Sequence, residues 1–241
     1  MPASTTDALS GTFLVTVQFP AEGERTYPAQ VRNLLEGFLL AIDYGFFDES
    51  PQRPATRMPE NTHWEEGQGE LRLRFSAERL PRFAFTILNG MFVGITEHLA
   101  AEITSPVAWH EGIEANLFTS PAQPLPALGE LPFEAEVPLH GNLYKSLRIW
   151  LDFYSPVPEG ERDSLLELFA VWDGLVLGPF PSRDRAIGNS WAANATTSFL
   201  LPTRLEHFVE DYESGSGAFD VLIRALLRLN ARLPIEAIEI E

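Results

Sequence analysis

The chain has 241 residues, contains no cysteine and carries a net charge of −17 at neutral pH. The lack of cysteine excludes disulfides, thiolate catalysis and cysteine-ligated zinc. The negative charge repels nucleic-acid backbones and anionic lipids, and no apolar stretch reaches membrane-spanning length, so we expect neither nucleic acid nor a membrane as a partner. The first ten residues are polar and lack an export signal, which predicts a loose tail on a cytoplasmic protein.

The first half of the chain predicts strand, helix, two strands, helix and strand, in that order. Alternating apolar residues favour strands at 11–19, 61–67, 71–75 and 107–113. Apolar residues at spacings of three and four predict an amphipathic helix from Val31 to Ile42, which ends at Gly45, and another from Phe85 to Leu99.

The second half predicts the same order of elements. Strands are expected at 147–153, 197–202, 205–209 and 235–240, and helices at 165–176, ending at Gly178, and 219–233. One additional alternating strand, 133–139, precedes them, and the turn His140-Gly141-Asn142 is expected to lead from it into the strand beginning at Leu147.

Matching sequence segments in the two halves indicate an internal duplication. The phrase Pro-Glu-Gly-Glu-Arg at 158–162 repeats Pro20-Ala21-Glu22-Gly23-Glu24-Arg25, and the apolar positions of the two later helices keep a constant offset, as Phe85 and Phe219 show. We therefore predict an α+β fold built from two ferredoxin-like units (strand, helix, strand, strand, helix, strand) with antiparallel sheets. The expected lobes are 11–118 and 133–241, joined by a proline-rich linker at 119–132.

Two long loops, one in each half, carry the first candidate site. Each loop has two arginines ahead of a tryptophan, the side chains most often found as interface anchors. These candidate partner- or ligand-binding residues are Arg53, Arg57 and Trp64 in the first half and Arg183, Arg185 and Trp191 in the second. The alternative is structural, since the same arginines could pair with carboxylates and hold the two halves together.

The open faces of the predicted sheets carry the second candidate site. Strand positions opposite the core include Trp150 and Tyr154 in the second half and Arg72 and Arg74 in the first. Packing of the two sheets against each other would explain the same residues.

Catalytic and metal motifs give no comparable signal. His110-Glu111-Gly112-Ile113-Glu114 has the outline of a helical metal motif, but its glycine and its place in a predicted strand keep the ligands off one helix face. The Gly-Ser-Gly text at 215–217 lacks the lysine of a phosphate loop and is typical of a flexible turn. We therefore expect no enzyme, no metal and no cofactor.

The excess of acidic groups is spread over both halves and allows two interpretations. It could serve solubility alone, or it could steer the protein onto a basic partner. The segment 199–203, followed by an acidic stretch and a final helix, resembles bacterial immunity proteins in outline. We expect a non-enzymatic, immunity- or inhibitor-type module that neutralises a basic protein such as a bacterial toxin. The alternative is a small-molecule or anion binder, or an enzyme, with its site between the lobes.

Overall fold

The structure is a computed structural model that describes residues 8–19, 28–48, 61–67, 69–99, 103–111, 115–119, 127–136, 146–176, 193–210 and 217–241. Within these ranges the chain forms four helices and nine strands arranged in two sheets, one for each half. The expected α+β class is confirmed.

The first half contains a four-stranded antiparallel sheet in the order β2-β3-β1-β4. Its strands are β1 (Ala8–Gln18), β2 (His63–Gly67), β3 (Glu70–Pro81) and β4 (Thr104–His110), and its helices are α1 (Pro28–Tyr44) and α2 (Arg82–Leu99). β1 thus begins ahead of residue 11, where the first lobe was expected to start.

The second half contains a five-stranded sheet in the order β5-β9-β6-β8-β7. Its strands are β5 (Glu134–Glu136), β6 (Ser146–Phe153), β7 (Ala193–Leu201), β8 (Arg204–Glu210) and β9 (Ile235–Ile240), and its helices are α3 (Glu159–Leu175) and α4 (Gly217–Asn230). The repeated phrase at 158–162 therefore forms the start of α3, where Glu159 and Glu161 suit the positive end of the helix dipole.

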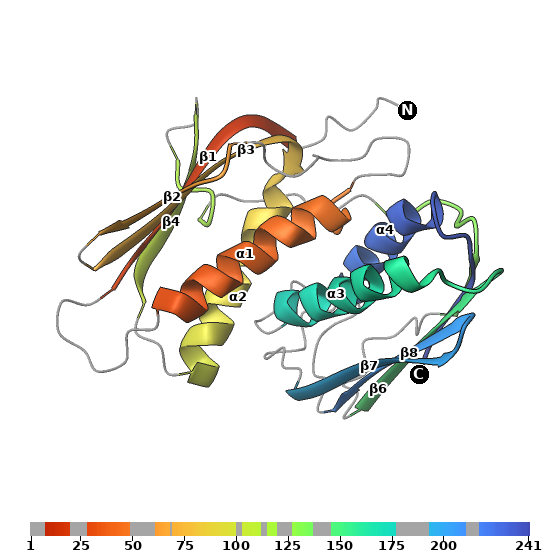
Figure 1. The fold of residues 1–241 in the computed structure, drawn as a ribbon. Helices are drawn as coiled ribbons and strands as arrows, with labels where there is room; N and C mark the ends of the chain where they lie inside the picture. Colours follow the sequence, from red (N-terminus) through yellow and green to blue (C-terminus); the bar gives the residue numbers. More distant parts are fainter. Residues whose placement is uncertain are drawn as a thin grey trace.

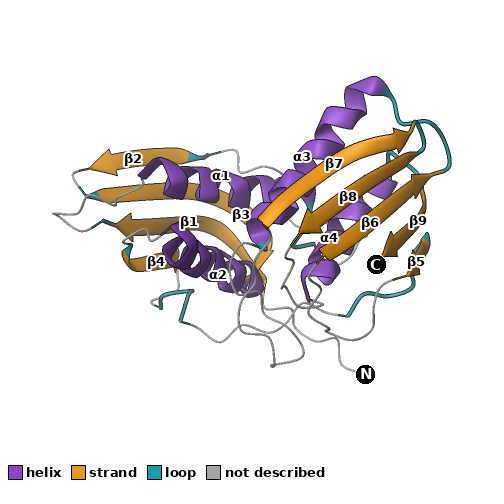
Figure 2. Ribbon diagram, turned by 90° about the horizontal axis from the view of Figure 1, so that it is seen from below, coloured by secondary structure: helices purple, strands orange, loops and turns teal. Residues whose placement is uncertain are grey.

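Two expectations about the sheets are wrong. The second sheet is mixed rather than antiparallel, because the additional strand β5 pairs in parallel with β9 and not with β6. The physical reason is that β8 and β9 occupy both sides of β6, which leaves the free edge of β9 as the place for a further strand. The sheets also do not pack on each other, since they lie on opposite outer sides of the molecule (Figures 1 and 2).

The helices form the centre of the molecule. α1 and α2 cover the inner face of the first sheet, α3 and α4 cover that of the second, and α1 lies against α3 (Figure 1). Inward residues of the strands are buried while their neighbours are not, as the alternating exposure along β3 and β6 shows. In the first half, the Phe13 ring stacks on Phe75 and Phe85 with centroids 5.2 and 5.3 Å apart.

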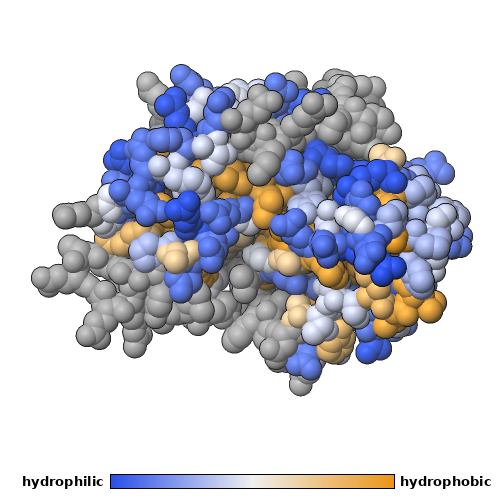
Figure 3. Space-filling view, viewed as in Figure 1, coloured by the Kyte–Doolittle hydropathy of each residue, from blue (hydrophilic) through white to orange (hydrophobic). Residues whose placement is uncertain are grey.

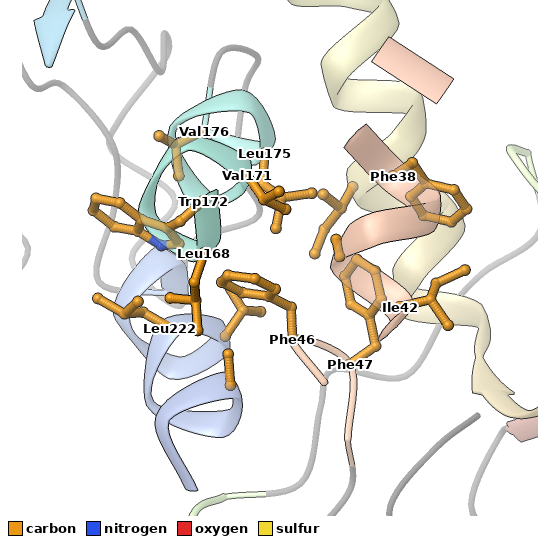
Figure 4. Packing of buried hydrophobic residues seen from close by; sticks show 14 of the residues in the cluster. Phe38, Ile42, Phe46, Phe47, Leu168, Val171, Trp172, Leu175, Val176 and Leu222 are labelled. Atoms are coloured by element: carbon orange, nitrogen blue, oxygen red, sulfur yellow. The ribbon is translucent and has the colours of Figure 1, made fainter. Parts of the chain in front are cut away.

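The end of α1 builds the junction between the halves. Gly45, at φ 83°, follows the helix, and the backbone N–H groups of Gly45 and Phe46 donate to the carbonyls of Ile42 and Ala41 at 3.1 Å, the pattern of a Schellman cap. This turn sends Phe46 and Phe47, both fully buried, into the interior. Phe46 points toward Leu168 and Leu222 of the second half, whereas Phe47 lies toward the α1 side (Figure 4).

A buried ion pair closes the same junction. Asp48, only 3 % exposed, accepts two hydrogen bonds of 2.8 Å from the guanidinium of Arg228 in α4. The Asp48 carbonyl also accepts a 2.6 Å bond from the buried Arg224. A side chain at Gly45 would place its Cβ 2.5 Å from Arg228 Nε, so glycine is needed here for space as well as for its positive φ. The segment 45–48 thus fastens the first half to the last helix.

Candidate functional site

Of the residues of the first candidate site, the structure describes only Trp64. Arg53, Arg57, Arg183, Arg185 and Trp191 lie outside the described residues, so their role in binding a partner or ligand, or in joining the halves, stays a prediction.

The contacts of Trp64 stabilise the fold of the first half. It lies half-buried in β2 and packs against the core, with the Arg32 guanidinium 5.0 Å from the centre of its ring. Arg32 is itself held by ion pairs to Glu36 at 3.0 Å and to Glu66 at 2.7 Å. These contacts tie β2 to α1 within the first half.

Trp150 lies on the outer face of the second sheet, as expected. Its indole Nε1 donates to Glu206 on β8 at 3.0 Å. Two guanidinium groups flank the ring: Arg148 lies 5.7 Å and Arg204 5.4 Å from its centre, both within the range of cation–π contact. The indole is therefore held in one orientation, although no layer of the described chain covers this face (Figure 2).

Carboxylates surround this tryptophan. Arg204 pairs with Asp152 at 3.0 Å and with Glu239 at 3.7 Å, and Arg148 approaches Glu206 at 3.5 Å. The strand register adds two more glutamates on the same face, because Glu136 lies beside Glu239 and Glu134 lies two residues before Glu136. Five carboxylates therefore stand against two guanidinium groups, and we call this surface the acidic face; its members are Glu134, Glu136, Arg148, Trp150, Asp152, Arg204, Glu206 and Glu239.

An apolar margin adjoins the acidic face. Tyr154, Leu200 and Leu201 are 66 %, 52 % and 57 % exposed. The backbone bonds from Phe153 and Val157 to the β7–β8 turn hold the end of β6 beside this hairpin. A hydrophobic patch is visible on this side of the second half (Figure 3). Exposed apolar groups rimmed by polar ones are typical of interaction surfaces.

A cavity of about 470 Å³ lies between the halves, where the alternative small-molecule site was expected. Its walls come from the end of α1, α3 and α4, and include Tyr44, Ser164, Arg228 and Arg232. The polar groups here bind one another: the Tyr44 hydroxyl donates to Glu167 at 2.5 Å, Arg232 pairs with Glu161 at 2.7 Å, and Arg228 holds Asp48. The cavity therefore borders the junction that joins the halves.

The Tyr44–Glu167 bond makes one part of this junction sensitive to high pH. Burial, followed by the bond to the Glu167 carboxylate, raises the pKa of Tyr44 above its ordinary value of about 10. The unfolded chain therefore ionises first, so this contribution to stability is complete below pH 10 and is lost as the pH rises beyond it. We expect Tyr44→Phe to be less stable than wild type at pH 8 in urea unfolding, with the difference narrowing toward pH 11. A constant difference would contradict the raised pKa.

The histidine candidates do not form a metal site in the described part of the chain, where no group of three potential ligands occurs. His110 lies in β4, where a strand was expected, and its ring packs on Phe13 with the centroids 4.8 Å apart. None of the described helices has the length and apolar character needed to cross a membrane.

Comparisons with known proteins leave the family open. No protein-family profile matches the chain, and no similar curated protein was found. A weak structural likeness was found to the periplasmic protease PqqL from Escherichia coli, with 13 % identity and a TM-score of 0.21 over 92 % of this chain. The chain spans about a third (34 %) of that protein.

The sequence pattern predicts the central tryptophan of the acidic face but not its partners. Arg148, Arg204 and Glu206 each lie directly beside a buried residue of their strand and two residues from another outward position, which is a detectable signal once the sheet order is known. Leu200 and Leu201 carry a signal in the sequence alone, since two adjacent leucines cannot both face the core from one strand.

Proposed function

We propose that this protein is a non-enzymatic, cytoplasmic protein-binding module whose acidic face covers a basic partner, in the manner of an immunity or inhibitor protein that neutralises a toxin. The single observation that carries the proposal is the fixed, partly exposed Trp150, which lies among an excess of carboxylates and near the exposed Tyr154, Leu200 and Leu201. An ordered aromatic anchor with an apolar margin and a charged surround is the usual anatomy of a protein interface.

The charges support a basic rather than an acidic partner. Of the two cations on the acidic face, Arg204 is already shared between Asp152 and Glu239, and Arg148 lies near Glu206. The remaining glutamates give the face a negative field that speeds the approach of a basic protein and that salt weakens. The alternative site between the halves has less support, because Tyr44, Arg228 and Arg232, which line its cavity, are each paired with a neighbouring carboxylate.

We also infer that the two halves are duplicated ferredoxin-like units. In each sheet the four strands of the expected unit stand in the same order, namely second, third, first and fourth. β5 is added at one edge of the second sheet. Both helices of each half cover one face of their sheet (Figure 1). The equivalent residues Phe85 and Phe219 are both buried, at 0 % and 2 % exposure. A duplication explains these matches with one ancestral unit.

The binding experiment uses basic proteins encoded next to this gene, produced singly and titrated onto the purified chain. We expect one of them to bind, and we expect Trp150→Ala to weaken binding about thirtyfold, as the loss of an interface anchor worth about 2 kcal/mol would do. The association rate should fall steeply between low and physiological salt.

The matched control is Trp109→Ala, which removes an exposed indole from the outer face of the first sheet and should leave partner binding unchanged. Co-production with a toxic partner should restore growth with wild type and not with Trp150→Ala. If none of the neighbouring proteins binds, if both tryptophan variants bind equally well, or if duplex DNA or RNA binds more tightly, the proposal is wrong.

A further inference from the structure

A hollow of about 440 Å³ lies on the outer face of the first sheet, on the opposite side of the molecule from the acidic face. Its floor and walls come from all four strands of the sheet and include Leu14, His63, Arg72, Arg74 and Trp109. A second hollow of about 320 Å³ adjoins it and shares Thr12, His63 and Arg74. Arg74 therefore lies where the two spaces meet. The larger hollow has the size of a small-molecule site.

The strand register places four different side chains in one row across this face. His63 on β2 pairs with Arg74 on β3, Arg74 pairs with Leu14 on β1, and Leu14 pairs with Trp109 on β4. Residues opposite one another in such a row project to the same side of the sheet. The row thus runs from an imidazole and a guanidinium, across an apolar floor, to an indole that is 39 % exposed.

The two arginines of this face differ in how their charge is compensated. Arg72 binds Glu70 at 2.7 Å and lies 3.8 Å from Glu65, which also has His63 at 3.7 Å. The Arg74 side chain, in contrast, makes no hydrogen bond or ion pair with any residue that the structure describes, although Glu65 and Glu111 also line the hollow. In a chain with twice as many acidic as basic residues, an exposed guanidinium without a carboxylate partner among the described residues is unusual.

We propose that this hollow binds a small organic carboxylate with a flat apolar body. The carboxylate binds Arg74, whose planar guanidinium suits a bidentate, charge-assisted pair of hydrogen bonds. The apolar body lies over Leu14 and against the Trp109 ring. This site is independent of the proposed protein-binding face and of the cavity between the halves.

The sheet geometry limits the size of the ligand. Arg74 and Trp109 lie on β3 and β4, with β1 between them, so their backbones are roughly 10 Å apart, two strand spacings. Both side chains extend into the hollow from its opposite sides and shorten this gap. A ring joined to a carboxylate by a short chain therefore fits better than a carboxylate attached directly to the ring.

The experiment titrates the full chain with 4-phenylbutyrate, indole-3-acetate and benzoate by calorimetry, with saturation-transfer NMR as a second readout. We expect saturable binding that is tighter for 4-phenylbutyrate than for benzoate. The amide and the amine of the same body, 4-phenylbutyramide and 4-phenylbutylamine, should bind at least tenfold more weakly, because neither can form the ion pair with Arg74.

Substitutions at Arg74 and Trp109 test whether the carboxylate binds at this row of side chains. Arg74→Met should weaken 4-phenylbutyrate binding roughly ten- to hundredfold, and Trp109→Leu several-fold. The matched controls Arg148→Met and Trp150→Ala make the same kinds of change on the second sheet and should leave carboxylate binding unchanged. Thermal melting of each variant confirms that it is folded, which is expected because Arg74 is exposed.

Three outcomes would overturn the proposal: no saturation with any of the three carboxylates up to roughly 10 mM, equal binding of the amine, or unchanged binding in Arg74→Met. None of these outcomes affects the basic-partner proposal, whose test variant Trp150→Ala lies on the other sheet. Conversely, failure to find a protein partner leaves the carboxylate measurements valid.

Discussion

Replacing Asp48 by alanine is expected to destabilise the protein by about 2–4 kcal/mol in urea unfolding. The carboxylate is 3 % exposed and receives two hydrogen bonds from the Arg228 guanidinium, which also donates to the Asp43 carbonyl. Its removal leaves a cation facing the buried end of α1, where water cannot replace the lost partner fully. The expected loss lies toward the lower part of the range for buried pairs, because the Arg228 side chain keeps 26 % of its surface exposed.

Two further variants show that this loss comes from the junction. Glu36→Ala breaks the ion pair with Arg32, whose partners are 47 % and 43 % exposed, and should cost less than about 0.5 kcal/mol. Asp48→Asn keeps the shape but turns an amide N–H toward a guanidinium N–H, so it should lose nearly as much as alanine. If Asp48→Ala is no more costly than Glu36→Ala, the Asp48–Arg228 pair does not hold the halves together.

Local patterns in the sequence predicted most of the elements. The three- and four-residue spacing from Val31 to Ile42 gave α1, and Gly45 marked its end, because both depend only on neighbours along the chain. Even the weak strand expected at 61–67 is present as β2. The least accurate boundaries are the start of α3, expected at Leu165 and found at Glu159, and the end of β3, expected at residue 75 and found at Pro81.

Contacts between distant segments could not be predicted in the same way. Asp48 follows a helix and Arg228 lies 180 residues later, so no spacing in the sequence links them. The pairing of β5 with β9 likewise depends on which edge of the sheet is free, which is decided by the order of all the strands. The sequence pattern assigns Trp64 to an arginine-bearing loop site, and only the structure shows that it packs on the core from β2.

The second large effect is expected at a pair of phenylalanines that the proposed duplication makes equivalent. Phe85 in α2 lies 5.3 Å from Phe13 and 6.0 Å from Phe38 between ring centroids. Phe219 in α4 lies 6.3 Å from Trp172, whose indole is fixed by a 2.9 Å bond to the neighbouring Ala218 carbonyl. Each ring is buried in the core of its own half, so alanine at either position leaves a cavity that rigid aromatic neighbours cannot fill.

We therefore expect Phe85→Ala and Phe219→Ala each to lower the free energy of unfolding by about 3–5 kcal/mol. Val93→Ala, on the same helix as Phe85 but 36 % exposed, is the matched control and should cost less than about 1 kcal/mol. Because the two phenylalanines lie in helices of different halves, their effects should add in the double variant. If one of them costs no more than Val93→Ala, the two positions are not equivalent, and the 134-residue correspondence between the helices is coincidental rather than the trace of a duplication.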